Sequence, residues 1–375
     1  MRIAILGAGP AGLYLGYLLK RRAPDADVTI IEQNPAGATF GFGVVFSDRA
    51  LEFLADDDEE TYAAIVPLME SWRDMTLNHP AGKIVIDGIG FAAIERLKLL
   101  QLLQARAASA NVTVIFGCAV KSLDELDEFD LVVGADGVNS LVRRSLAAEM
   151  GATVGQLTNR FAWFGTTQVF DTLTQSFVDT EWGAFNAHHY RYADDRSTFI
   201  VETGAETFAR AGLAQMDEAR SKALCERIFG EVLAGEPLIS NHSIWRQFPL
   251  VHNERWSHGK YVLLGDALHT AHFSIGSGTR LALEDAIALD KALAAHPNDL
   301  PAAFATYEAA RRPVLEKLVA GANGSADWYE HFGQHMTLPP ADFAMSYITR
   351  SGRVDIERLR KLSPNFVGWY EAATA

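Results

Sequence analysis

The sequence has little cysteine, no long apolar run and no excess of positive charge. Its 375 residues include two cysteines, Cys118 and Cys225, which cannot form a disulfide framework and lack a CxxC spacing for zinc. No apolar segment approaches the roughly 20 residues that a transmembrane helix requires. Acidic residues outnumber basic ones by 47 to 33, and the net charge of −14 argues against nucleic acid or an anionic membrane as a partner. We therefore expect a cytoplasmic protein without a metal site, a membrane span or a nucleic-acid partner.

The first 33 residues, MRIAILGAGPAGLYLGYLLKRRAPDADVTIIEQ, predict a strand over 3–6, a helix over about 10–21 and a second strand over 28–32. Gly7, Gly9 and Gly12 form GxGxxG, which allows a tight turn, close approach to a pyrophosphate and close helix packing. The helix N-terminus then offers free amides to phosphates. Glu32 ends the second strand, where an acid can bind a ribose hydroxyl. The predicted dinucleotide ligands of this segment are Gly7, Gly9, Ala11, Gly12, Glu32 and Gln33.

Two later segments each place an aspartate after a buried strand. FDLVVGADGVNSLVRR has Asp136 in this position, and YVLLGDA has Asp266. The carboxyl ends of strands in an α/β sheet are where ligand groups are presented. Downstream, Gly276 and Gly278 precede a helix and would free backbone amides for a phosphate or a flavin oxygen. The histidines of the same stretch match no zinc template, so we expect no metal there.

Several of these elements together resemble one family. GAGPAG at 7–12, the DG pair at 136–137, the GD pair at 265–266 and YEAARRPVLEKL at 307–318 are similar to the group A FAD-dependent aromatic monooxygenases, relatives of para-hydroxybenzoate hydroxylase. The resemblance spans almost the whole chain and implies tightly bound, non-covalent FAD, with Asp266 on the ribitol and Arg96 beside the flavin. Because no second GxGxxG is present, NADH or NADPH is expected to bind only transiently.

The stretch after the GD pair departs from the usual pattern of that family. The family has proline at Phe273, glutamine at Ser277 and asparagine at Arg280. With these departures, GDALHTAHFSIGSGTRLALEDAIAL, STFIVET and TRSGRV look like the salicylyl-CoA 5-hydroxylases and 2-aminobenzoyl-CoA monooxygenases. This implies hydroxylation of an aryl-CoA thioester by O2 through a C4a-hydroperoxyflavin, with salicylyl-CoA 5-hydroxylation to gentisyl-CoA as the leading reaction.

Three alternatives stay open. The substrate could be 2-aminobenzoyl-CoA, or it could be a free aromatic or indole compound, as in the violacein-pathway hydroxylases that share HFSIG. A flavin-binding protein without hydroxylase activity is the remoter alternative.

Residues 161–202 alternate in polarity with a period of two, which predicts an antiparallel sheet. His188 and Tyr190 would share one face with Asn186, and the resemblance places such a face over the flavin. His188 is therefore a candidate base for a ring hydroxyl, with a core histidine as the equal alternative. His272 and Phe273 are further candidate catalytic residues, and Tyr190 is a candidate substrate ligand.

We expect an α/β fold in three parts. A Rossmann-like FAD-binding domain (1–75, 95–158 and 257–330) receives an inserted antiparallel-sheet substrate domain (76–94 and 159–256) and is followed by a helical tail (331–375). In the tail, Arg350 and Arg353 flank a glycine in TRSGR and are candidate ligands for CoA phosphates. A solvated basic face is the alternative for Arg358, Arg360 and Lys361. A homodimer is left open.

Overall fold

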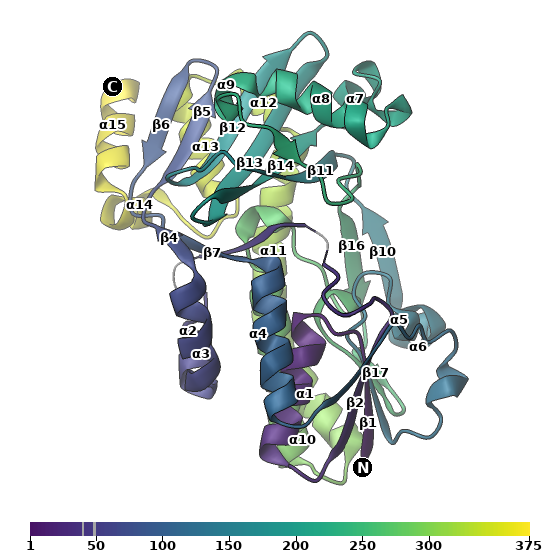
Figure 1. The fold of residues 1–375 in the computed structure, drawn as a ribbon. Helices are drawn as coiled ribbons and strands as arrows, with labels where there is room; N and C mark the ends of the chain where they lie inside the picture. Colours follow the sequence, from purple (N-terminus) through teal and green to yellow (C-terminus); the bar gives the residue numbers. More distant parts are fainter. Residues whose placement is uncertain (40, 48–49) are drawn as a thin grey trace.

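In the computed structural model, which describes residues 1–39, 41–47 and 50–375, the chain forms two lobes (Figure 1). The first lobe holds a six-stranded sheet in the order β17–β18–β9–β1–β2–β8. Its strands are β1 (Arg2–Leu6), β2 (Asp27–Glu32), β8 (Thr113–Phe116), β9 (Leu131–Gly134), β17 (Ser257–His258) and β18 (Tyr261–Leu263). Because β1 pairs in parallel with both β2 and β9, the first strand of the chain lies inside the sheet.

Four long helices pack in this lobe, and the last of them extends from it to the second lobe. They are α1 (Pro10–Arg22), α4 (Arg96–Ser109), α10 (Gly278–Ala295) and α11 (Leu300–Glu330). α1 packs against both α4 and α10. α11 spans 31 residues and runs from the first lobe to the second (Figure 1). Among the helices of the described residues, none is long and apolar enough to cross a membrane.

The second lobe holds a seven-stranded sheet in the order β15–β11–β14–β13–β12–β5–β6. Its strands are β5 (Met75–His79), β6 (Gly82–Ile86), β11 (Arg160–Thr166), β12 (Leu173–Thr180), β13 (Gly183–Ala193), β14 (Arg196–Thr203) and β15 (Leu238–Ile239). One face buries Phe185, Phe199 and Val201 in a cluster with residues of three helices. These helices are α7 (Ala205–Arg210), α8 (Glu218–Ile228) and α9 (Gly230–Leu233). The opposite face carries His188 and its alternating neighbours.

Two smaller sheets and several short helices complete the chain. The sheets are β3–β7–β4, from β3 (Gly43–Ser47), β4 (Glu70–Trp72) and β7 (Phe91–Glu95), and β10–β16, from β10 (Ala152–Gln156) and β16 (Pro249–Asn253). The remaining helices are α2 (Glu52–Asp57), α3 (Glu59–Ile65), α5 (Leu141–Ser145), α6 (Ala147–Met150), α12 (Phe332–His335), α13 (Pro340–Thr349), α14 (Ile356–Leu362) and α15 (Pro364–Thr374). Short 3-10 turns are η1 (Val66–Leu68), η2 (Leu123–Leu126), η3 (Leu213–Gln215), η4 (Gly265–Ala267) and η5 (Phe273–Ile275).

This architecture confirms the predicted α/β fold with a Rossmann-like lobe and an antiparallel-sheet region. The N-terminal strand, glycine turn and helix occur where the sequence predicted them. The predicted segment 76–94 supplies β6 and most of β5 to the large sheet but also most of β7, which pairs with β3 instead. The domain boundaries themselves stay a prediction.

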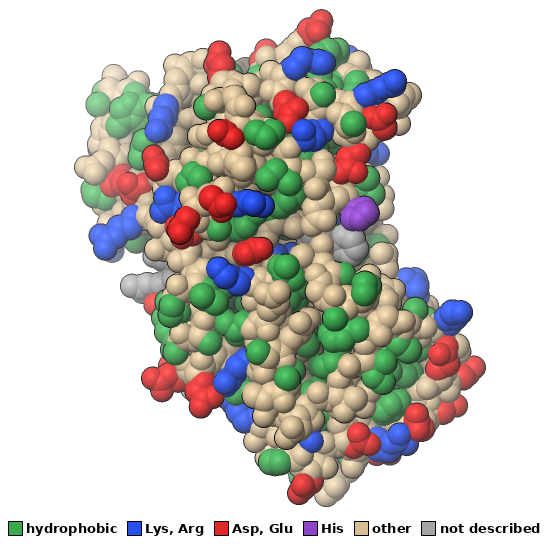
Figure 2. All heavy atoms as spheres, viewed as in Figure 1, with side chains coloured by type: hydrophobic (Ala, Val, Ile, Leu, Met, Phe, Trp, Pro, Cys, Tyr) green, Lys and Arg blue, Asp and Glu red, His purple; other side chains and the backbone are tan. Residues whose placement is uncertain are grey.

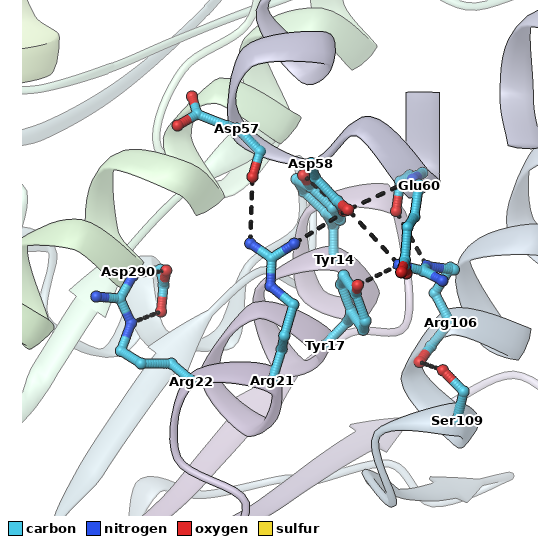
Figure 3. Close-up of polar contacts among 11 residues, drawn as sticks. Tyr14, Tyr17, Arg21, Arg22, Asp57, Asp58, Glu60, Arg106, Ser109 and Asp290 are labelled. Atoms are coloured by element: carbon cyan, nitrogen blue, oxygen red, sulfur yellow. Dashed lines mark hydrogen bonds and ion pairs between the residues drawn. The ribbon is translucent and has the colours of Figure 1, made fainter. Parts of the chain in front are cut away.

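Charged side chains of both signs are interspersed on the face of the molecule shown in Figure 2. Some charged side chains are buried. One of them is Asp58 at the start of α3, which is only 4% exposed. Its carboxylate pairs with Arg21 at 3.0 Å and Arg106 at 3.5 Å and accepts a 3.3 Å hydrogen bond from the Tyr14 hydroxyl (Figure 3). We call these four residues the Asp58 cluster. It ties α1, α3 and α4 together.

Candidate active site

The glycine turn after β1 has the shape that a pyrophosphate requires. Gly7 has φ +99°, and a Cβ there would lie 2.4 Å from the carbonyl oxygen of Ala135. A Cβ at Gly12 would lie 2.1 Å from the carbonyl oxygen of Gly7, so neither position tolerates a side chain. A Cβ at Gly9, by contrast, would meet no atom within 4 Å, and no side chain caps the N-terminus of α1. An anionic group can therefore approach the free amides of the turn directly.

Glu32 closes the far side of this turn. One carboxylate oxygen accepts a hydrogen bond from the Ala8 amide at 2.8 Å, and the other accepts from the Asn34 amide at 2.8 Å. The carboxylate thus lies at the end of β2 beside the glycine turn, where a ribose hydroxyl would meet it. Gln33 is exposed next to it, and Ala11 is buried within α1.

The GD pair forms η4, directly after β18. Ala11 fixes the position of this turn, since a Cβ at Gly265 would lie 3.2 Å from the Ala11 methyl. Asp266 is accessible to solvent while both of its neighbours are buried. Surrounding protein atoms raise its pKa by desolvation, and His269 and Arg96 oppose that effect. The carboxylate of Asp266 is thus available to a ligand while protein atoms surround its base.

A buried carboxylate behind Asp266 holds the turn in place. Asp285 of α10 accepts hydrogen bonds from His269 at 2.7 Å, from the Gly265 amide at 3.1 Å and from Arg311 of α11 at 2.9 Å. These partners lower the pKa of Asp285 although its burial acts in the opposite direction. Asp285 is therefore an anion at neutral pH that joins the GD turn to two helices.

Two glycines and a helix end face the same region. Gly276 has φ +60°, and a Cβ there would lie 3.1 Å from the Val45 carbonyl oxygen, whereas Gly278 has open space around it. Gly278 begins α10, whose first turn has no side-chain cap and no acidic residue. The free amides at this end suit a flavin oxygen.

Two buried polar atoms without partners show where a ligand would bind. They are Nε of Arg96, at the start of α4, and Oδ1 of Asp136, which follows β9. Asp136 uses its other oxygen to accept from the Leu141 amide at 2.6 Å. Unpartnered buried groups are costly, so native proteins rarely keep them without a ligand or water. Together with the glycine turn, these residues fit a dinucleotide cofactor with a flavin ring.

A second polar group lies on the inner face of the large sheet. His188 on β13 is 3% exposed, and neither ring nitrogen has a hydrogen-bond partner among the described residues. Burial, followed by the charge of Arg350, lowers its pKa to about 3. The ring is therefore neutral at neutral pH, and its free lone pair can accept a hydrogen bond.

Sequence reasoning placed Asn186 on the face of His188 but missed Gln175 and Glu202. Gln175 on β12 is directly opposite His188, and Asn186 on β13 is directly opposite Glu202 on β14. Both amide atoms of Gln175, Oδ1 of Asn186 and Oε2 of Glu202 are buried without partners. One signal in the sequence could have identified Gln175. It is a polar residue at the alternating position between Leu173 and Phe177, which are both buried in an apolar cluster.

The HFSIG loop closes this face from the other side. The Phe273 ring lies 5.0 Å from Phe161 and 6.4 Å from His188, measured between ring centroids. Phe161, Trp163, Phe248 and Phe273 are all half-buried and form an aromatic rim beside His188. The structure thus brings His188, His272 and Phe273 together, as a catalytic group would require.

His272 is bonded, unlike His188. Its Nδ1 is 2.8 Å from the Ser274 hydroxyl, which is 2.8 Å from the Ser325 hydroxyl on α11. Arg350 donates to that Ser325 hydroxyl at 2.9 Å, and burial lowers the pKa of His272 to about 3. This chain of contacts supports the loop and leaves only Nε2 of His272 for a ligand.

Two of the predicted substrate ligands are already engaged within the protein. Arg350 also donates to the Tyr347 carbonyl at 2.6 Å and the Ser274 carbonyl at 3.1 Å, and its guanidinium stacks on the Tyr347 ring. Each of its three nitrogens thus already has an acceptor, which places Arg350 in support of the HFSIG loop. The Tyr190 hydroxyl donates to the Gly43 carbonyl at 3.0 Å and is buried. A direct substrate contact for either residue would have to compete with these bonds.

Arg353 has a different environment. It is exposed, and its guanidinium has no hydrogen bond or ion pair to another residue in the described part of the chain. Its stem lies against α11, where a Cβ at Gly321 would be 3.1 Å from its Cδ. Arg280 and Arg358 lie close enough to lower its pKa further, in addition to partial burial. We call these three residues the arginine cluster, and Arg280 is the residue at which the sequence departs from the family's asparagine.

Two surface hollows of about 430 and 480 Å³ lie elsewhere. The first lies against α10 and α11, and the second against β3, β4 and β7. Neither contains a predicted site residue. In the described ranges, no group of three or more histidine, cysteine or acidic side chains could hold a metal ion.

Fold and site together define a flavoprotein oxidoreductase. The FAD binding domain family matches residues 109–322, and an NAD(P)-binding Rossmann-like domain matches residues 5–41. The chain is 42% identical to the salicyloyl-CoA 5-hydroxylase of a Streptomyces species, over 94% of this chain and 70% of that protein. It is 35% identical to the 3-hydroxy-4-methyl-anthranilyl-[aryl-carrier protein] 5-monooxygenase of Streptosporangium sibiricum, over 94% and 95%. The chain therefore belongs to the FAD-dependent aromatic monooxygenases.

Solved structures agree on the fold. PqsL of P. aeruginosa superposes with a TM-score of 0.70 at 23% identity, covering 88% of this chain and 96% of that one. The cofactors of the family are FAD and a nicotinamide dinucleotide. When bound, they supply the hydride and the activation of O2 that ring hydroxylation requires. The residues described above would hold the FAD, with the glycine turn and Glu32 on its adenosine side and Asp266, Arg96 and the start of α10 near its flavin.

Proposed function

We propose that this monooxygenase hydroxylates the ring of an aryl-CoA thioester, with conversion of salicyloyl-CoA to the 5-hydroxy product as the leading reaction. Substrate, O2, NAD(P)H and a proton would give the hydroxylated ring, NAD(P)⁺ and water. The observation that carries the thioester is the arginine cluster. It offers Arg353 unpaired beside Arg280 and Arg358, on a chain whose net charge is −14.

Arg353 of the cluster lies just after α13, close in sequence to the residue that supports the substrate face. Arg350, three residues before Arg353, is bonded to Ser274 of the HFSIG loop, which in turn contacts His272. A ring held beside His188 could therefore extend a phosphate-bearing arm toward Arg353. Binding energy from this remote anionic arm can position the ring for reaction, so a free acid should lose turnover as well as affinity.

His188 is the proposed base. Its neutral imidazole, beside Phe273 and without partners among the described residues, can accept a hydrogen bond from a ring hydroxyl and so raise the electron density of the ring. Full transfer of the proton requires that bound substrate and cofactor raise the pKa of His188 from its value of about 3. The carbon para to that hydroxyl is then the favoured target, because it is electron-rich and less crowded than the ortho carbon. Carbon 5 of salicyloyl-CoA is this carbon.

The test compares NADH and NADPH oxidation and product mass for salicyloyl-CoA, 2-aminobenzoyl-CoA and the two free acids. We expect the thioesters to stimulate oxidation far more than the acids. Equal stimulation by a free acid would transfer the proposal to a free-substrate hydroxylase, and oxidation that yields only hydrogen peroxide would leave a flavoprotein without hydroxylase activity.

The arginine cluster is tested by Arg353→Ala. Because Arg353 is exposed, we expect at most about 1 kcal/mol, a few-fold rise in KM for the thioester, with the FAD spectrum intact. Arg360→Ala is the matched control, since Arg360 is an exposed arginine of α14 that is paired with Glu357 and Glu371. An unchanged KM for both variants would remove the cluster from the proposal.

A further inference from the structure

Gln175 is the buried polar residue with the least explanation inside the protein. It is 0% exposed, and neither its amide nitrogen nor its amide oxygen has a hydrogen-bond partner among the described residues. A side-chain amide can make four hydrogen bonds, two as donor and two as acceptor, so Gln175 is left with its whole capacity unused. Each buried group left unsatisfied costs about 1–3 kcal/mol. An apolar residue of the same size would therefore stabilise the fold more than Gln175 does.

Strand register fixes the direction in which Gln175 points. It is directly opposite His188 on β13 and Leu77 on β5, and its alternating neighbours Leu173 and Phe177 belong to the apolar cluster under this face. The next residue, Thr174, is opposite His189 and faces the other side. Gln175 and His188 therefore form one cross-strand pair on the inner face, about 4.5–5.5 Å apart between Cβ atoms in such a pair.

We propose that Gln175 and His188 form the subsite that reads an aromatic ring carrying a hydrogen-bonding group next to an acyl carbonyl. This rests on the proposed function. His188 accepts from the ring hydroxyl or amino group, and the Gln175 amide donates to the adjacent thioester carbonyl oxygen. The hydroxyl or amino group and the thioester carbonyl are on adjacent ring carbons. Their spacing corresponds to that of His188 and Gln175, which lie side by side on neighbouring strands.

The pair determines which ring carbon reacts. With a single hydrogen bond to His188, the ring can turn over and present either of its two sides to the cofactor. With a second bond from Gln175, only one orientation satisfies both groups, and the carbon para to the donor group is held in place. Gln175 is thus a specificity-determining residue, and its loss should scramble the position of hydroxylation.

The test is Gln175→Leu, which keeps the approximate volume and removes both polar atoms. We expect a fold at least as stable as the wild type by thermal unfolding, because an unsatisfied group is replaced by an apolar one. With salicyloyl-CoA we expect binding about 2- to 12-fold weaker, less product per NADH, and a mixture of 3- and 5-hydroxylated products. Gln175→Met, which keeps the approximate length but has no hydrogen-bond donor, should show the same mixture.

Two controls make the outcome readable. Thr174→Val changes the adjacent residue on the opposite face and should leave the product ratio unchanged. Benzoyl-CoA keeps the thioester carbonyl and lacks the ring hydroxyl, so Gln175→Leu should weaken its binding by a factor similar to that for salicyloyl-CoA, measured by the perturbation of the flavin spectrum. If wild type hydroxylates no thioester, the proposed function fails. If wild type does so and Gln175→Leu and Gln175→Met keep both its affinity and its single product, this inference fails while the proposed function stands.

Discussion

Two buried polar regions of this molecule differ in how completely they are bonded. In the Asp58 cluster, one carboxylate has two arginines and a tyrosine hydroxyl around it (Figure 3). On the inner face of the large sheet, Gln175 and His188 have four buried polar atoms that find no hydrogen-bond partner among the described residues. The hydrogen-bonding groups of the Asp58 cluster bind one another and join helices. Those of Gln175 and His188 are available to a bound ligand. Both regions are buried, so burial does not distinguish a structural polar group from a candidate ligand-binding group. The presence or absence of hydrogen-bond partners within the protein does.

The largest effect that would sharpen this comparison concerns His188. Replacing it by glutamine should lower turnover on a phenolic thioester by about 10²–10⁴-fold, because the proton acceptor is lost, while flavin reduction and thermal stability survive. Stopped-flow reduction and product formation measure the two parts separately. His189→Gln is the control, since His189 is the adjacent residue, faces the other side and is bonded to Ser176 at 2.8 Å. Loss of folding instead of turnover in His188→Gln would make His188 a core histidine.

The opposite outcome is expected in the Asp58 cluster. Asp58→Asn keeps the shape but removes the charge that pairs with Arg21 and Arg106, which should lower the free energy of unfolding by about 1.5–3 kcal/mol. Urea unfolding measures this loss, and kcat of the folded protein should not change. A change in kcat at unchanged stability would show that the two regions do not divide their tasks in this way.

The next effect concerns the cofactor cleft. Asp266→Ala should weaken FAD retention by about 1.5–3 kcal/mol, roughly 10- to 100-fold in Kd, because a charge-assisted bond to the cofactor is lost. Fluorescence of released FAD after gel filtration provides the measurement. Since Asp285 rather than Asp266 holds the turn, the apoprotein should unfold at the wild-type temperature. A large drop in that temperature would mean that Asp266 also supports the fold.

The last effect appears only as a change with pH. Burial raises the pKa of Glu202 to about 8, above its ordinary value of 4.5, so the folded protein holds a proton that the unfolded chain releases between these values. Stability should therefore fall as the pH rises from 4.5 through 8 and level off above it. Glu202→Gln stays neutral throughout and should be more stable than wild type at pH 8.5 but similar at pH 4.5. Parallel stability curves for the two proteins would contradict a protonated Glu202.

The sequence predicted the first lobe well because its chemistry is local. Gly7 and Gly12 lie within one strand–turn–helix unit, where spacing alone dictates geometry, and the GD turn follows directly from β18. Arg96 was predicted as a cofactor ligand only from the family resemblance, and Asp136 only from its place at the end of a strand. Their unpartnered atoms appear only in three dimensions.

The substrate face was harder to predict because it depends on contacts between distant strands. Alternation along β13 placed Asn186, His188 and Tyr190 on one face, but only the register with β12 shows Gln175 opposite His188. Arg350 looked like a phosphate ligand because a basic residue beside glycine often binds anions. The structure instead bonds it to Ser274, Ser325 and Tyr347, residues that no local pattern connects to it. Arg353 was predicted, while its company with Arg280 was not.

The order of strands in the six-stranded sheet has a consequence for how the chain is made. β1 is synthesised well before two of its sheet partners, since its neighbour β9 begins at residue 131 and β18, which pairs with β9, ends only at residue 263. α10, which packs on α1, follows later still. The apolar strand β1 and helix α1 therefore remain without these partners until residue 263 has been made, and nascent chains truncated before that residue should be the ones that chaperones retain.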